Sequence, residues 1–218
     1  MFWVTKLDKN PALKVRCKMK EIISHVETGK YPKCVFQASN YNPEGGLGTL
    51  SAMNIGELLL LDFDPEIDST RRTLERIPEN DPQWKPHPKS MAIGRLALHV
   101  ARLPEFWTRI LTTSELNMAH EKFPDIIFES TAHLLSELER TAGEAKSQTA
   151  DASDDHLRAT WKLSFGDRVI FEAPRMLLYR TVFLNHVVHH RAQLGVYLRL
   201  LNLPVPGLYG PSADEPFS

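Results

Sequence analysis

Apolar residues recur at helical spacing in four stretches of the chain, and proline-rich or polar connections separate these stretches. The first stretch predicts a helix over residues 64–78, with Asp64 as its N-cap and Pro65 at its first helical position. An earlier start near Ser51, with Pro65 as a kink or break inside the helix, is the alternative.

The second stretch predicts a helix over residues 90–103, because Ser90 can act as an N-cap and Pro104 lies just beyond the last periodic position. A long connection follows, with a short helical piece expected near residues 106–111. Pro124 opens the third predicted helix, which runs to about residue 145.

The fourth stretch, residues 175–201, is the longest uninterrupted helical pattern. Before it, apolar and polar residues alternate on both sides of the Gly166-Asp167 pair, which is typical of a small β-hairpin. Four long helices with little strand predict an all-α fold, namely a four-helix bundle with a small hairpin between helices three and four.

Two parts of the chain differ in organisation. Residues 51–218 carry the four helical stretches and are expected to form the bundle, whereas residues 1–50 show no sustained periodicity. We expect residues 1–50 to be an amino-terminal extension, either an accessory arm or a segment that packs poorly. Its two cysteines, Cys17 and Cys34, lack a metal-binding spacing and are interpreted as free thiols.

Charge and hydropathy exclude some partners. The 26 basic residues nearly balance the 27 acidic residues, so no long-range field attracts phosphate backbones or anionic lipids. The longest apolar run, Leu58–Leu61, is far shorter than the roughly 20 residues of a membrane-spanning helix. No nucleic-acid partner and no membrane association are therefore expected, and a cytoplasmic location follows.

Two of the nine histidines, His186 and His190, are four residues apart and thus share one face of the last predicted helix. Two neutral imidazoles at this spacing can both direct a ring nitrogen to one metal ion. Hydrogen bonding within the core or a solvated helix face is the alternative reading. His186 with His189 is the competing pair.

A third ligand is available on the second predicted helix, where His99 lies in the apolar stripe of Ala92, Leu96 and Leu103. A histidine inside such a stripe needs a polar partner, because an unsatisfied buried polar group is costly. A metal ion shared with His186 and His190 would supply that partner. A core histidine with an ordinary hydrogen bond is the alternative.

Two blocks of sequence resemble one known family. The first block is WKPHPKS at residues 84–90 with LALHVARLP at 96–104, and the second is LNHVVHHRAQLGVY at 184–197 with PVPGLYGPS at 204–212. Over roughly residues 55–215 the chain resembles the DinB-like superfamily. The resemblance implies a four-helix bundle in up-down-down-up order with a metal site of His99, His186 and His190 at one end.

The resemblance also implies a chemistry. Characterised members look like transferases and isomerases that activate a low-molecular-weight thiol at the metal, so we expect a metal-dependent transferase acting on a small electrophile in stress or detoxification. A metal-dependent hydrolase and a non-enzymatic metal-binding stress-response scaffold are the alternatives. Zinc or nickel is the expected metal, ahead of iron, manganese or copper. The expected partners are a small-molecule substrate and a second copy of the chain in a homodimer.

Gln193 and Tyr197 continue the helical stripe of His186 and His190 and are the candidate catalytic residues. Beside a metal, they would orient a bound water or thiol. Ordinary helix capping or interhelical hydrogen bonding is the alternative role for both.

Overall fold

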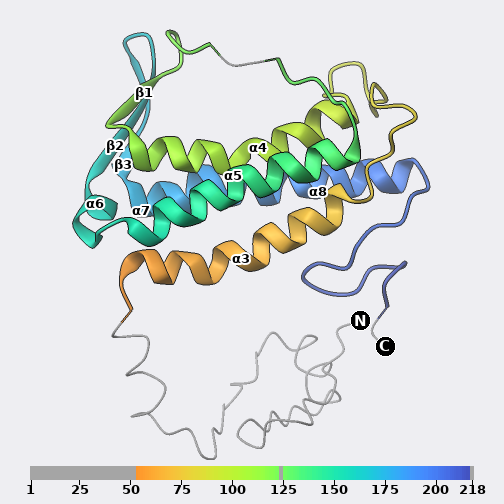
Figure 1. Cartoon of the computed structure of the whole chain (residues 1–218). Coiled ribbons are helices and arrows are strands. Elements are labelled where there is room, and N and C mark those ends of the chain that lie inside the picture. Colours follow the sequence, from red (N-terminus) through yellow and green to blue (C-terminus); the bar gives the residue numbers. More distant parts are fainter. Residues whose placement is uncertain (1–52, 123–124, 217–218) are drawn as a thin grey trace, which may run out of the picture. The chain divides into compact units, whose positions relative to one another are not determined.

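Four long helices make up nearly half of the part of the chain that the computed structural model describes, which is residues 53–122 and 125–216 (Figure 1). They are α3 (Ile55–Leu74), α4 (Ile93–Thr112), α5 (Thr131–Asp151) and α8 (Asn185–Leu200). The mostly helical fold predicted from the sequence is confirmed. The predicted extension over residues 1–50 lies outside the described residues.

Hydrogen bonds between the helices define their directions. α4 and α5 are parallel, since the Thr141 hydroxyl donates to the carbonyl of Ala101 and, further along both helices, the Trp107 ring donates to Thr149. α8 runs antiparallel to α4, and α3 runs in the same direction as α8 (Figure 1). Parallel neighbours need a long connection, which explains the extended segment between α4 and α5.

α3 begins earlier than our first prediction. Its N-cap is Asn54, whose side chain accepts from the N–H of Glu57, while the Glu57 carboxylate accepts from the N–H of Asn54. This capping box satisfies two free donors of the first turn and fixes the start of the helix. Asp64 is therefore not an N-cap, and Pro65 lies inside the helix, closer to the alternative prediction.

α4 continues past Pro104, so the predicted end at Leu103 is wrong. Proline costs about 3 kcal/mol within a helix, but the apolar stripe continues through Trp107 and Ile110, both fully buried. The predicted N-cap Ser90 is also wrong. The first donors of α4 are satisfied by main-chain carbonyls of the preceding proline-rich loop instead of by a side chain: Ile93 N–H donates to Trp84 and Gly94 N–H to Pro82.

α5 begins at Thr131, after the N-cap Ser130, and not at Pro124 as predicted. The Ser130 hydroxyl accepts from the N–H of His133 and thereby caps the first turn of the helix. The final helical run is continuous over α7 (Arg175–Leu178), the π-helical segment η1 (Tyr179–Leu184) and α8, in agreement with the prediction for this region.

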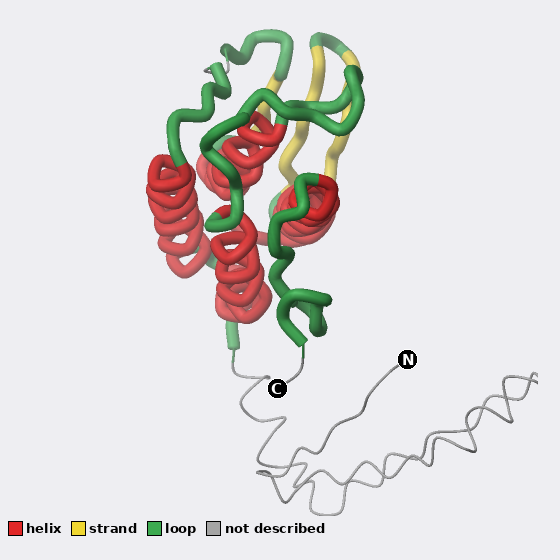
Figure 2. The backbone as a smooth tube through the Cα atoms, turned by 90° about the vertical axis from the view of Figure 1, so that its right-hand side faces the viewer, coloured by secondary structure: helices red, strands yellow, loops and turns green. Residues whose placement is uncertain are grey.

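A small sheet lies at the end of the helices where α4 ends and α7 begins (Figure 1), and Figure 2 shows its strands in yellow. β2 (Thr160–Phe165) and β3 (Arg168–Pro174) form the predicted antiparallel hairpin, with Gly166 at φ 58° in its turn. β1 (Glu115–Asn117) pairs parallel with β2 and was not predicted, because three residues are too short to show alternation. The short helix α6 (Asp154–Arg158) precedes β2.

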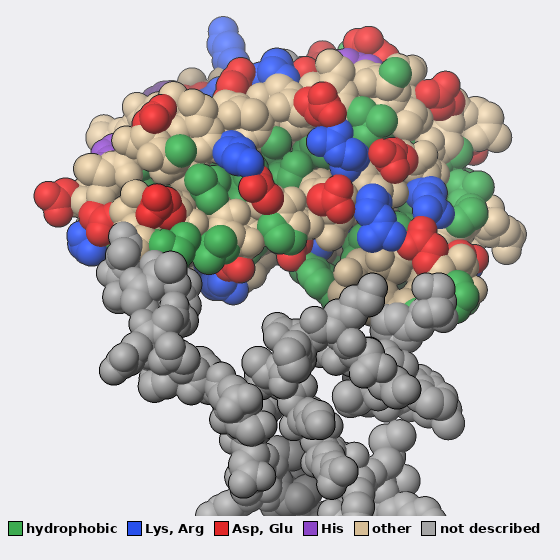
Figure 3. Space-filling model, turned by 60° about the horizontal axis from the view of Figure 1, so that its bottom comes forward, with side chains coloured by type: hydrophobic (Ala, Val, Ile, Leu, Met, Phe, Trp, Pro, Cys, Tyr) green, Lys and Arg blue, Asp and Glu red, His purple; other side chains and the backbone are tan. Residues whose placement is uncertain are grey.

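The surface of the helical part carries mixed charge. On the face shown in Figure 3, acidic and basic side chains alternate over the helices with apolar side chains between them. Between α5 and α3, Lys146 forms an ion pair with Asp64 at 2.8 Å. None of the helices within the described residues is long and apolar enough to cross a membrane.

Candidate metal site

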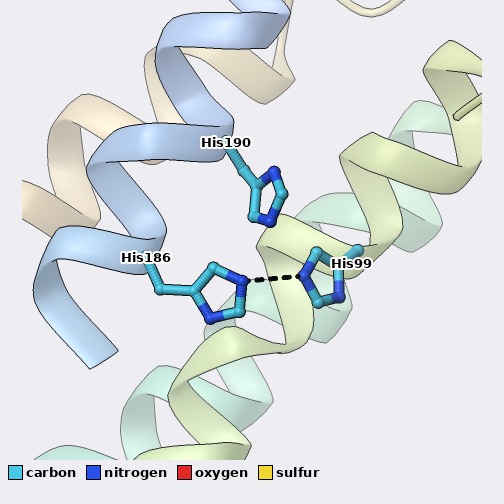
Figure 4. A group of neighbouring side chains, drawn as sticks. All are labelled: His99, His186 and His190. Carbon is cyan, nitrogen blue, oxygen red and sulfur yellow. Dashed lines mark hydrogen bonds between the residues drawn. The ribbon is translucent and has the colours of Figure 1, made fainter. Parts of the chain in front are cut away.

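Three histidine rings converge between α4 and α8 (Figure 4). His186 and His190 lie one turn apart on α8, with ring centroids 4.7 Å apart, and His99 approaches from α4. Nε2 of His99 is 3.4 Å from Nε2 of His186, and one ring nitrogen from each of the three residues lies within 4.8 Å of the others. The three histidines predicted from the sequence therefore lie together, although metal binding itself stays a prediction.

The helix that carries two of these rings is locally irregular. Residues 179–184 form a π-helix, and the Asn185 N–H donates to the carbonyl of Arg180 five residues back. Such segments are rare and occur often at functional sites. Here the segment ends just before His186, whose ring is hydrogen-bonded to the carbonyl of Val182.

Hydrogen bonds fix the orientation of the two α8 rings. Nδ1 of His190 is 2.7 Å from the Oε1 atom of Gln193, which can only accept, so Nδ1 carries the proton and Nε2 keeps its lone pair. The carbonyl of Val182 accepts a hydrogen bond from the ring of His186 and so also limits its rotation. Metal-binding histidines are commonly held in this way through their second nitrogen.

All three imidazoles favour the neutral form. Burial, and then the neighbouring His190 and His186 rings and Arg95, lower the pKa of His99 to about 4. Burial also lowers the pKa of His186, and it lowers that of His190 although the hydrogen bond with Gln193 opposes this. A metal ion requires neutral imidazoles, so near neutral pH it would displace no proton from these rings.

A cavity of about 700 Å³ lies beside the histidines, and His99 and His186 form part of its wall. This volume is suited to a small molecule. The sheet contributes to its wall through β2 and β3, and the connection after β1 contributes as well. Its apolar lining residues are Leu103, Phe106, Met118, Ile126, Leu163, Phe171 and Val182.

The two candidate catalytic residues have different surroundings. Gln193 contacts the histidine cluster directly, through His190. Tyr197 lies further along α8, where its hydroxyl donates to the carbonyl of Met91 and its ring packs edge-on against Trp84. Gln193 is therefore placed to position a ligand, whereas Tyr197 is placed to hold α8 against the loop before α4.

The remaining histidines that the structure describes lie apart from the cluster or at its edge. His189, the competitor of His190 in the sequence, is exposed and lines the cavity, with its ring 4.8 Å from that of His190. His133 lies on α5, with Nδ1 3.7 Å from the carboxylate of Glu129. His25 lies outside the described residues.

Sequence reasoning missed the charged residues of the cavity. Arg102, Glu105 and Arg109 line it from α4. Arg102 follows His99 by three residues within the same block of sequence, so its position on the helix was visible. Its role was not, because charged residues on helices are common and the cavity is formed by segments distant in sequence.

Comparison with known proteins supports one family. A model described as the DinB family matches residues 53–216 of the chain. A solved DinB-like protein from Bacillus cereus is similar in fold, with a TM-score of 0.54 at 21% identity over 70% of this chain and 97% of that one. A candidate DinB family member from Exiguobacterium sibiricum gives 0.49 at 18% identity over 69% and 93%. No curated protein matches the sequence.

Proposed function

This chain belongs to the DinB family, and we propose on that premise that it is a metal-dependent transferase, which joins a low-molecular-weight thiol to a small electrophile. Its metal ligands are His99, His186 and His190. The helical part is then a four-helix bundle in up-down-down-up order, with the site between its second and fourth long helices. The observation that carries the proposal is the convergence of three neutral imidazoles, two of which line a cavity of about 700 Å³.

The donor set fits a divalent ion such as zinc or nickel. Zinc–nitrogen bonds of about 2.0–2.1 Å at a tetrahedral angle place two ligand nitrogens about 3.4 Å apart, and the Nε2 atoms of His99 and His186 are 3.4 Å apart. His190 presents the nitrogen that Gln193 leaves free. Three protein ligands leave a coordination position for a small molecule, as in catalytic sites.

A divalent ion at such a site lowers the pKa of a coordinated thiol or water and thereby supplies a nucleophile near neutral pH. The chain provides the remaining requirements. Gln193 keeps the ring of His190 in place, and the apolar cavity walls keep water away from the electrophile. The overall reaction forms a carbon–sulfur bond and releases the leaving group together with the thiol proton.

The first test is the metal content of the purified full chain, measured by mass spectrometry after reconstitution with zinc or nickel. The site variant carries His186→Ala and His190→Ala. A matched control carries His87→Ala and His120→Ala, which remove two exposed histidines outside the cluster. Each protein is then assayed for consumption of small thiols with 1-chloro-2,4-dinitrobenzene as electrophile.

We expect about one metal ion per chain in the wild type and in the control, and both metal and thiol consumption lost in the site variant. Wild-type protein that holds no metal would contradict the proposed site. Metal retained without thiol consumption, but with ester hydrolysis, would favour the hydrolase, and metal without any turnover the binding scaffold. The homodimer and the stress-response role stay predictions.

A further inference from the structure

The cavity beside the histidines contains a cation whose hydrogen-bonding capacity is largely unused. Arg102 lies three residues after His99 on α4, and both residues line the cavity. Three residues advance about 4.5 Å along a helix and leave the two side chains as neighbours on its surface. A molecule in the cavity could therefore contact the guanidinium group and the histidine cluster at the same time.

Arg102 has a single acceptor within the described part of the chain. Its Nε atom donates to Oε2 of Glu137 at 2.6 Å, whereas its Nη1 atom is buried and has no hydrogen-bond partner. A guanidinium group has five N–H donors, and buried donors are nearly always paired. Nη1 and Nη2 of Arg102 therefore have no acceptor among the described residues.

Glu137 does not need Arg102 as its only cation. Arg140 donates to both carboxylate oxygens of Glu137 at 3.2 Å, through Nε and Nη2. This hydrogen bonding with Arg140 is the largest cause that lowers the pKa of Glu137 to about 2. Glu137 thus orients Arg102 through its Nε atom only, and the other two nitrogens of the guanidinium group do not bond to this carboxylate.

The other walls of the cavity indicate what the ligand would be. Phe106, Leu163 and Phe171 are among its apolar residues, so the body of the ligand is apolar. The two remaining nitrogens of a guanidinium edge match the two oxygens of a carboxylate in one plane. A molecule that satisfies both features is a small carboxylic acid with an apolar body.

We propose that Arg102 binds the carboxylate of the substrate and that the cavity is specific for small apolar carboxylates. The inference rests on the proposed function for the reaction near the histidines, but the binding step itself needs no metal. Arg102 is then a specificity-determining residue one turn from His99.

The carboxylate of Glu105 allows a second test, in which the direction of the change in affinity is predicted. Glu105 also lines the cavity, and its carboxylate is 3.7 Å from Arg140. A negative charge there repels an anionic ligand but not a neutral one. Removal of that charge should strengthen carboxylate binding and leave the binding of a neutral ligand unchanged.

The experiment compares two probes that differ only in charge, 4-phenylbutyrate and its neutral amide. Their binding to the full chain is measured by isothermal titration calorimetry after removal of metal with EDTA, because a metal would itself attract a carboxylate. The variants are Arg102→Gln and Glu105→Gln. The control is Arg158→Gln, which removes an exposed arginine that is paired with Asp154 on α6.

We expect the wild type and the control to bind the carboxylate about tenfold or more tightly than the amide. Arg102→Gln should abolish this preference and leave amide binding within about twofold, while Glu105→Gln should increase the preference. Equal binding of the two probes, a preference that survives Arg102→Gln, or no carboxylate binding at millimolar concentration would overturn the proposal. Metal content measured on samples of the same proteins without EDTA treatment tests the histidine site separately, so failure of one does not imply failure of the other.

Discussion

His190 and Arg191 are neighbours on α8 but belong to polar clusters of opposite kinds. The Arg191 side chain is 1% exposed, and the chain itself provides all of its partners. It donates to the Glu66 carboxylate at 2.6 Å, to the Glu66 carbonyl at 2.9 Å, to the Thr70 hydroxyl at 3.2 Å and to Tyr209. This cluster connects α8, α3 and the carboxy-terminal segment.

The histidine cluster on the adjoining side of α8 is different. His190 has one partner in Gln193, and its second nitrogen lies with those of His99 and His186 around a common point. Polar groups that are satisfied within the chain hold a fold together, whereas ring nitrogens of three histidines that converge on one point indicate a ligand. The two clusters should therefore respond in opposite ways to mutation and to added metal.

The largest expected effect comes from Arg191→Ala. Removal of one partner from a buried ion pair leaves the Glu66 carboxylate without its cation, which typically costs about 3–5 kcal/mol. We expect a loss of this size in the free energy of unfolding, measured by urea denaturation of metal-free protein. Arg199→Ala is the control, because this arginine forms an exposed pair with Asp214 that should contribute less than about 1 kcal/mol. Similar losses in both variants would contradict the assignment of the buried cluster to stability.

The second expected effect is stabilisation by added metal, which should depend on the histidine cluster and not on the Arg191 cluster. A metal ion that binds only the folded chain stabilises it by about 2.7 kcal/mol at a free concentration of one hundred times its Kd. We expect a stabilisation of this order when zinc or nickel is added to the wild type, and none for His190→Ala, with thermal unfolding as the measurement. A variant that is stabilised as much as the wild type would show that the metal binds elsewhere.

The third effect concerns the residue that orients His190. Gln193→Leu removes the acceptor at Nδ1 and frees the ring to rotate, and loss of such a partner typically weakens metal binding 10–100-fold. We expect that decrease in affinity by competition with a chromogenic chelator. Tyr197→Phe is the matched control, since this hydroxyl contacts the carbonyl of Met91 and no histidine of the cluster. If both variants bind metal as the wild type does, Gln193 is not a positioning residue.

The sequence predicted the helices better than their ends. Apolar periodicity depends on burial along a whole helix, which is why four helices and a hairpin were predicted. The ends depend on individual hydrogen bonds. α4 starts where the carbonyls of Pro82 and Trp84 accept its first N–H groups, and no side chain marks that position, so Ser90 was misleading. Pro104 was misleading for the opposite reason, because packing further along the helix outweighs its cost.

The residues of the site also fall into those that could be predicted from the sequence and those that could not. His186 and His190 could be paired from their spacing, and His99 from its apolar stripe, because helix geometry alone brings such residues onto one face. Arg102 could not be identified, since the meaning of its unpaired nitrogen depends on Glu137 of α5 and on a cavity closed by the sheet. Sequence patterns predict which residues share one face of a helix. Only the tertiary structure shows which polar groups lack a hydrogen-bond partner.

The smallest expected effect is a pH dependence confined to the histidine cluster. In the folded chain the pKa of His99 is about 4, whereas an unfolded histidine titrates near 6.5. Between these values the unfolded chain binds more protons, so the free energy of unfolding of metal-free protein should decrease as the pH falls from 6.5 to 4. His186 and His190 act in the same direction, because their pKa values are also lowered.

The contribution of His99 can be isolated with His99→Gln, which keeps a polar side chain but cannot titrate. Since the ring is not fully buried, its share should be on the order of 1 kcal/mol between pH 7 and pH 5. Urea denaturation of both proteins at the two pH values gives this share as a difference, in which the carboxylates common to both chains cancel. If the free energy of unfolding changes equally in both proteins between the two pH values, His99 is hydrated in the metal-free protein. Burial then does not prepare a neutral ligand at this position.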